Sequence, residues 1–238
     1  VAFLTKTGGD PQALLEGPMT SPWSNKEPIR EELFSIDRLE EHARSLAAVQ
    51  KVDPTLTGGQ SLAARLDDNS TILLDAYHKT VEAIEEGRAI TPASEWLVDN
   101  YHLVERHIRE IRSDLPRGYY RQLPKLMEGP FAGFPRVFGL AWAFVAHTDS
   151  RIVPDMLLRY LGAYQAVQPL TIGELWAVSV TLRIVLIENL RRLARNARRE
   201  KGAVQDARVR EAIKHQRGVF VCQRHQCPHH GLVPGREG

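Results

Sequence analysis

The sequence predicts an all-α protein, built as a multi-helix bundle or as stacked helical hairpins. In several segments apolar residues recur at three- and four-residue steps, which is the period of an amphipathic helix. Capping residues and glycines bound these segments, and no segment shows the alternation of β-branched residues that is typical of a strand. We expect an irregular lead-in at 1–32, a helical domain at 33–200 and a tail at 201–238.

The first helix is expected to follow the lead-in, which is interrupted by several glycines and prolines and shows no sustained period. Ser35 is placed to cap this helix, which we expect to run to about Lys51. Its apolar face consists of Ile36, Leu39, Ala43, Leu46 and Val49.

Two more helices are expected, one on each side of Gly87. The first should begin at a cap on Asn69 or Ser70 and stop at Gly87. Thr91 then caps a helix that has Pro92 at its first position, where the missing N–H costs nothing. The apolar residues of this second helix are Leu97, Tyr101, Val104, Ile108 and Ile111.

The second half of the sequence predicts a loop followed by three helices. The stretch at about 116–135 is rich in glycine, proline and aromatic residues, which indicates an ordered loop that packs its rings on the helices. Helices are expected at 137–147 and 154–167. Thr171 and Glu174 form a T-x-x-E capping box before the most apolar helix, which runs from 175 to about 195.

The composition is that of an ordinary globular protein and excludes some classes of function. The chain is 43% hydrophobic and carries a net charge of +2, so we expect no nucleic-acid partner. The apolar stretches at 137–146 and 175–187 are shorter than the roughly 20 residues of a membrane span. We therefore expect buried core helices and no transmembrane segment. Because the chain begins with Val1, we expect it to be a fragment; processing or an error in the gene start would give the same first residue.

A cluster of cysteines and histidines near the C-terminus is the strongest metal-binding pattern in the sequence. Thiolates and imidazoles are zinc ligands, and four candidates fall within nine residues: Cys222, His225, Cys227 and His229. Standard zinc fingers bring two ligand pairs from separate elements, and this spacing does not match them. We therefore prefer a tail without metal, either disordered or translated out of the native reading frame.

Other polar and aromatic residues have simple structural interpretations. The pair Asp67 and Asp68 suggests a metal-bound nucleotide sugar, but one acidic pair before a helix usually complements the helix dipole. The basic run at 191–201 is interpreted as a solvated helix end in preference to a contact with anionic lipid or nucleic acid. Core positions are favoured over sugar-stacking positions for the helical tryptophans Trp96, Trp142 and Trp176.

Five segments resemble, in the right order, the N-terminal region of bacterial cyclic β-1,2-glucan synthases. The resemblance as a whole extends over about residues 33–199. The segments are ITPASEWLVDNYH at 90–102, DLPRGYYRQLPK at 114–125, PRVFGLAWAFVAHTDS at 135–150, QPLTIGELWA at 168–177 and LRIVLIENLRR at 182–192.

This resemblance implies a very large enzyme of the bacterial inner membrane that polymerises glucose from UDP-glucose, trims the chain and cyclises it. In that family the glycosyltransferase and phosphorylase-like modules lie C-terminal to the matched region, and their acidic and Q-x-x-R-W motifs are absent from this sequence. No catalytic residue of the family can be placed here. We therefore expect no catalysis by this chain alone and no cofactor bound to it.

The function expected from the resemblance is that of an accessory helical region on the cytoplasmic side of the membrane. It would pack on the downstream glycosyltransferase and membrane modules and could also contact β-1,2-glucan. The residues expected to contact a partner or glycan are Trp96, Tyr101, Glu174 and Trp176. The alternative is a free-standing helical interaction module that binds a protein partner or, through residues 191–199, an anionic membrane surface.

Overall fold

A computed structural model describes residues 22–56, 61–114 and 118–199. Within these ranges the regular secondary structure is helical apart from one two-stranded sheet, which confirms the all-α prediction. The elements are α2 (Ile36–Val49), β1 (Val52–Asp53), α3 (Leu62–Glu85), α4 (Pro92–Asp114), α5 (Tyr119–Gln122), β2 (Lys125–Leu126), α6 (Arg136–His147), α7 (Pro154–Gln165) and α8 (Ile172–Arg199).

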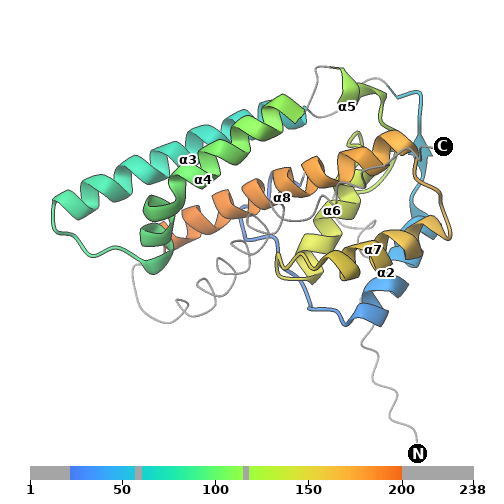
Figure 1. Cartoon of the computed structure of the whole chain (residues 1–238), viewed down its shortest axis with the longest axis horizontal. Coiled ribbons are helices and arrows are strands. Elements are labelled where there is room, and N and C mark those ends of the chain that lie inside the picture. The colour runs from blue at the N-terminus through green and yellow to red at the C-terminus, as the bar shows by residue number, and fades with distance from the viewer. Residues whose placement is uncertain (1–21, 57–60, 115–117, 200–238) are drawn as a thin grey trace, which may run out of the picture.

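Helix α8 is the central element of the fold (Figure 1). It packs on α6 on one side and on the hairpin of α3 and α4 on another, while α2 packs on α7. The α3–α4 hairpin extends away from the part of the molecule that holds α2, α6 and α7 (Figure 1). The long α8 therefore joins two groups of helices into one core.

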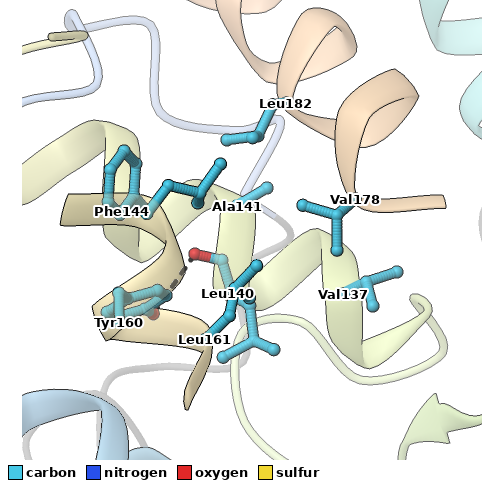
Figure 2. Close-up of a pocket in the computed structure, with 9 residues that line it drawn as sticks. Val137, Leu140, Ala141, Phe144, Tyr160, Leu161, Val178 and Leu182 are labelled. Carbon is cyan, nitrogen blue, oxygen red and sulfur yellow. Dashed lines mark hydrogen bonds between the residues drawn. The ribbon is translucent and has the colours of Figure 1, made fainter. Parts of the chain in front are cut away.

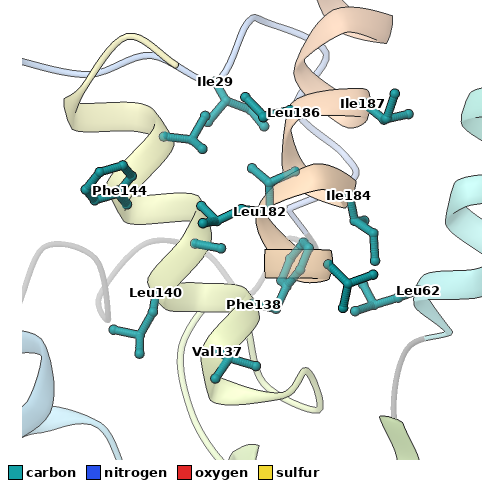
Figure 3. Packing of buried hydrophobic residues seen from close by; sticks show 14 of the residues in the cluster. Ile29, Leu62, Val137, Phe138, Leu140, Phe144, Leu182, Ile184, Leu186 and Ile187 are labelled. Atoms are coloured by element: carbon teal, nitrogen blue, oxygen red, sulfur yellow. The ribbon is translucent and has the colours of Figure 1, made fainter. Parts of the chain in front are cut away.

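The centre of the core lies between α6 and α8 (Figure 3). Phe138 and Phe144 of α6 and Leu182 and Leu186 of α8 are almost completely buried, and Ile29 covers the same contact. Burying a side chain of this size contributes about 1.5–3 kcal/mol. Because α6 is apolar on nearly every side, it can be surrounded by other elements, as the sequence predicts for residues 137–147.

The described part of the lead-in, residues 22–32, has no regular secondary structure but belongs to the core. The ring of Trp23 meets the rings of Phe134 and Phe138 edge-on, with centroids 5.3 and 5.4 Å apart. The backbone N–H of Ile29 donates to Asn189 Oδ1 on α8 at 2.7 Å. Contacts with α6 and α8 thus hold this irregular segment in place, although these helices lie far from it in the sequence.

Most of the predicted helix starts and stops are confirmed by hydrogen bonds or backbone angles. Ser35 Oγ accepts from the backbone N–H of Arg38 at 3.4 Å, and Thr91 Oγ1 accepts from that of Ser94 at 3.2 Å. Gly87 follows the end of α3 with a φ of +67°, a conformation that favours glycine.

The predicted start of α3 is wrong. The helix begins at Leu62 and is capped by Ser61, whose Oγ accepts from the backbone N–H of Ala64 at 3.1 Å. Asn69 lies inside the helix and is completely buried on its apolar face. A polar residue on that face interrupts the apolar period, which makes the first turns look like a loop in the sequence.

The aromatic loop at 116–135 is ordered over its described part, as predicted. Strands β1 and β2 pair antiparallel, with Val52 opposite Leu126 and Asp53 opposite Lys125. Lys125 is buried, and its Nζ donates to the backbone carbonyls of Leu56 at 2.6 Å and Arg121 at 2.8 Å. One buried ammonium group therefore connects the loop to the segment after α2.

A pH-dependent contact joins Phe34, just before α2, to α2 and α6. The ring of Phe34 stacks on that of His147 with centroids 3.9 Å apart, and His42 meets both rings edge-on. Burial, together with the nearby His147, lowers the pKa of His42 to about 4. Within the described residues, His42 Nε2 is buried without a hydrogen-bond partner. The folded state therefore resists protonation of this ring.

We expect the fold to lose stability in mild acid because of His42. Its ordinary pKa of 6.5 lies above the folded value, so the unfolded chain binds the proton first and stability falls as the pH drops from about 6.5 toward 4. Between about pH 7 and pH 5 the loss should be about 2 kcal/mol. Urea unfolding at both pH values checks this, with His42→Phe as the control that lacks the titrating group. Equal losses in both proteins would contradict the prediction.

Candidate functional site

Trp176 lies open to solvent on the first turns of α8, with 78% of its surface exposed. The core position that the sequence favours for this residue is therefore wrong. Ile172 is 72% exposed and Leu175 is 39% exposed. The three residues are spaced three and four apart, so they lie on one side of the helix. We call Ile172, Leu175 and Trp176 the apolar stripe.

The opposite side of the same turns is buried and holds the stripe in place. Ala177 and Val180 belong to the core, so the stripe faces outward from α8. The hydroxyl of Tyr119 on α5 donates to the backbone carbonyl of Gly173 at 2.5 Å. The core contacts and the hydrogen bond from Tyr119 therefore both fix the first turns of α8, and they fix the position of the stripe as well.

Glu174 lies on the buried side of these turns with no exposed surface. Its carboxylate accepts from Arg136 Nε at 2.5 Å and from Arg136 Nη2 at 2.7 Å. The predicted capping box also forms, because Thr171 N donates to Glu174 Oε2 at 2.8 Å and Glu174 N donates to Thr171 Oγ1 at 3.2 Å. The structure thus places Glu174 beneath the stripe, where it fixes the start of α8.

Trp96 and Tyr101 lie on α4, and the structure does not bring them near the stripe. Both are partly buried against the core, and the ring of Tyr101 stacks on that of Tyr77 with centroids 4.6 Å apart. Arg183 on α8 pairs with Asp114 at 2.6 Å, so the last turn of α4 lies beside the first half of α8. Tyr101 is about 20 Å further along α4 at 1.5 Å per residue.

The first two residues of the basic run, Arg191 and Arg192, are buried, which corrects the interpretation of a solvated helix end for this part of the run. Glu188, which is fully buried, accepts from Arg191 Nη2 at 2.6 Å and from Arg192 Nε at 2.7 Å. Arg65 of α3 reaches the same carboxylate with Nε and Nη2, both at 2.9 Å. We call these four residues the arginine cage.

The arginine cage also fastens the lead-in to α8. Arg192 is 1% exposed, and its two terminal nitrogens donate to the backbone carbonyls of Glu27 at 2.9 Å and Pro22 at 2.7 Å. Burial alone would raise the pKa of Glu188, but hydrogen bonds from the three arginines lower it to about 2. The carboxylate is therefore charged at neutral pH and engaged inside the protein.

The candidate metal ligands Cys222, His225, Cys227 and His229 all lie outside the described residues. Among the residues that are described, no three His, Cys, Asp or Glu side chains are grouped so that they could hold a metal ion. The acidic pair 67–68 lies inside α3, not before it, and pairs with Arg112 at 2.8 Å and Arg65 at 3.1 Å.

A cavity among α6, α7 and α8 is too small to be a sugar site (Figure 2). Its volume is about 10 Å³, which is close to the smallest space that holds a single water molecule. Apolar side chains line it, and the hydroxyl of Tyr160 at its edge donates to the backbone carbonyl of Leu140 at 3.3 Å. The exposed apolar stripe is therefore a stronger candidate for recognition than this cavity.

Comparison with known proteins supports the resemblance seen in the sequence. Over 176 residues, 73% of its length, the chain is 43% identical to the cyclic beta-(1,2)-glucan synthase NdvB of Rhizobium meliloti (strain 1021). The chain is homologous to a segment of a cyclic β-(1,2)-glucan synthase. The match spans 6% of the length of the Rhizobium synthase. No protein-family model matches the chain. None of the helices in the described ranges is long and apolar enough to cross a membrane.

Proposed function

We propose that this chain is a helical accessory region of a cyclic β-1,2-glucan synthase. In this proposal, other modules of the same polypeptide transfer glucosyl residues from UDP-glucose on the cytoplasmic side of the bacterial inner membrane. The observation that carries the proposal is the 43% identity to the Rhizobium synthase over 176 residues. A match of this length covers most of the helices described above and is much more specific than a short motif.

The roles of the buried carboxylates support an accessory function. Buried acids are often catalytic, but buried carboxylates also belong to structural ion-pair networks. Glu188 is enclosed by the arginine cage, and Glu174 is bound by Arg136 and by the first turn of α8. Both carboxylates therefore hold helices together, and neither is exposed to a sugar substrate.

The burial of two arginines weakens the alternative of a free-standing module that binds an anionic membrane. Such binding needs basic side chains that reach the lipid headgroups. Arg191 and Arg192, the first two residues of the basic run, are instead buried and paired with Glu188. The exposed apolar stripe on α8 suits a surface that binds a protein partner better than one that binds an anionic membrane.

The proposal predicts that this chain can replace its counterpart in the Rhizobium synthase. We expect a chimera that carries the chain in place of the matching segment to make cyclic glucan in isolated membranes. Deleting the segment should lower the incorporation of glucose from radiolabelled UDP-glucose into glucan at least about tenfold. This is the size of effect expected when packed contacts between modules are lost. The isolated chain should incorporate none.

A second chimera serves as the control and carries an unrelated helical domain of similar length at the same place. It should be as inactive as the deletion if the region makes specific contacts. Immunoblots of the membranes correct the activity for the amount of enzyme present. Full activity in the deletion variant, or glucosyl transfer by the isolated chain, would overturn the proposed function.

A further inference from the structure

We infer that the apolar stripe of α8 is a docking surface for another segment of the same polypeptide. This inference rests on the proposed function, because it assumes that the chain is one region of a longer synthase. Through this surface the region would contact the rest of the enzyme. The stripe consists of Ile172, Leu175 and Trp176, as defined above.

The stripe differs from apolar residues that are scattered singly on a surface. Ile172, Leu175 and Trp176 share one face of a helix, and the more buried residues of the same turns lie on the other face. Isolated exposed apolar residues are normal, whereas contiguous apolar patches mark interaction sites. Exposed hydroxyl residues lie at both ends of the stripe, Thr171 and Ser179. An apolar centre between polar ends is the usual arrangement of an interface.

The stripe is held in one orientation before any partner binds. The capping box, the Arg136–Glu174 pair and the hydrogen bond from Tyr119 to Gly173 all fix the first turns of α8. The hydroxyls of Tyr120 and Thr181 share a further hydrogen bond one turn beyond the stripe. A rigid surface pays little conformational entropy when it binds, so a small contact area can suffice.

The size of the stripe favours a covalently linked occupant over a second copy of the chain. Three such side chains can bury on the order of 400 Å². A stable complex between free proteins buries about 800 Å² on each partner. A linked segment needs less area, because its effective concentration is in the millimolar range. The Rhizobium relative has such segments, since the match spans 6% of its length.

The side chains of the stripe determine which kind of partner surface can pack against it. Aliphatic side chains and a single indole ring match an apolar helix face or an apolar loop with aliphatic and aromatic residues. The stripe itself contains no charged side chain. Its contact energy should therefore come mainly from apolar burial centred on Trp176, the largest and most exposed of the three residues.

Site-specific photocrosslinking in the active chimera tests this inference. A benzophenone amino acid replaces Ile172, and mass spectrometry of the irradiated enzyme identifies the peptide that is captured. We expect a peptide from the same polypeptide, outside the segment homologous to this chain. The matched control carries the crosslinker at Leu158 of α7, which is 67% exposed and lies outside the stripe. This control should give no such product.

A charge placed in the stripe provides a second readout. Trp176→Glu should lower the yield of the crosslink from position 172 and the glucan synthesis of the chimera at least about tenfold. Leu158→Glu should leave both unchanged. Circular dichroism of the isolated chain should show the same thermal midpoint for Trp176→Glu as for the parent, because Trp176 is mostly exposed.

The possible outcomes separate this inference from the proposed function. Capture of a second copy, of lipid or of glucan, or no capture at all, would overturn the docking surface. Unchanged capture and synthesis in Trp176→Glu would also overturn it. If the deletion still abolishes synthesis in that case, the proposed function stands without the docking surface. If the deletion has no effect, the proposed function fails independently of the stripe.

Discussion

Replacing Glu188 with alanine should lower the free energy of unfolding by about 3–5 kcal/mol, the cost of breaking a buried ion pair by removing one partner. Glu188 is the shared acceptor of Arg65, Arg191 and Arg192, and the last two are almost completely buried. Without the carboxylate, their charges would remain in the core with no acid to balance them. Urea unfolding followed by circular dichroism measures the loss.

The same carboxylate gives the fold a second dependence on pH. The folded pKa of Glu188 is about 2 and its ordinary value is 4.5, so the folded state binds the proton less readily. Its stabilisation is fully present above about pH 4.5 and disappears as the pH falls toward 2. The total is at most about 3 kcal/mol. Glu188→Gln should remove this dependence below pH 4.5 and leave the dependence due to His42 in place.

An exposed ion pair provides the matched control for Glu188. Glu86 pairs with Arg88 near the tip of the α3–α4 hairpin, and both side chains are mostly exposed. Glu86→Ala should change the free energy of unfolding by less than about 1 kcal/mol, as is usual for surface pairs. Similar effects in Glu86→Ala and Glu188→Ala would contradict the structural role of the arginine cage.

The sequence predicts those parts of the fold that depend on neighbouring residues. The caps at Ser35, Thr91 and Thr171 and the stop at Gly87 each involve residues within one or two turns, so short patterns reveal them. The arginine cage could not be predicted in this way. Its acceptor Glu188 lies 123 residues from Arg65, and only the packing of α3 on α8 brings them together.

The candidate site could be predicted only in part from the sequence, because it too depends on contacts between distant residues. The resemblance pointed to Trp176, but the surrounding positions of α8 are apolar on several sides, which is typical of a buried helix. The exposed face became apparent only when the packing of α6 and α5 on the other sides was known. Ile172 and Leu175 therefore gave no separate signal. Glu174 carried a clear capping pattern, but its partner Arg136 lies 38 residues away.

Glu174→Ala should be the second strongly destabilising substitution, with an expected loss of about 3–5 kcal/mol in the free energy of unfolding. The change removes the N-terminal capping box of α8 and leaves the guanidinium of Arg136, itself buried, without its acid partner. Capping accounts for about 1 kcal/mol of the loss, so most of it should come from the buried charge. Urea unfolding measures the total.

Two further variants separate these contributions. Thr171→Ala removes the hydroxyl that accepts from Glu174 N and donates to Glu174 Oε2, leaves the Arg136–Glu174 pair in place and should cost about 1 kcal/mol. The double variant Arg136→Met/Glu174→Ala removes both charges and should be more stable than Glu174→Ala alone, because no unpaired charge remains in the core. A double variant less stable than Glu174→Ala would show that Arg136 stabilises the fold even without its acid partner. Since the same turns carry the apolar stripe, Glu174→Ala in the chimera should also weaken the crosslink from position 172, whereas Glu86→Ala should not.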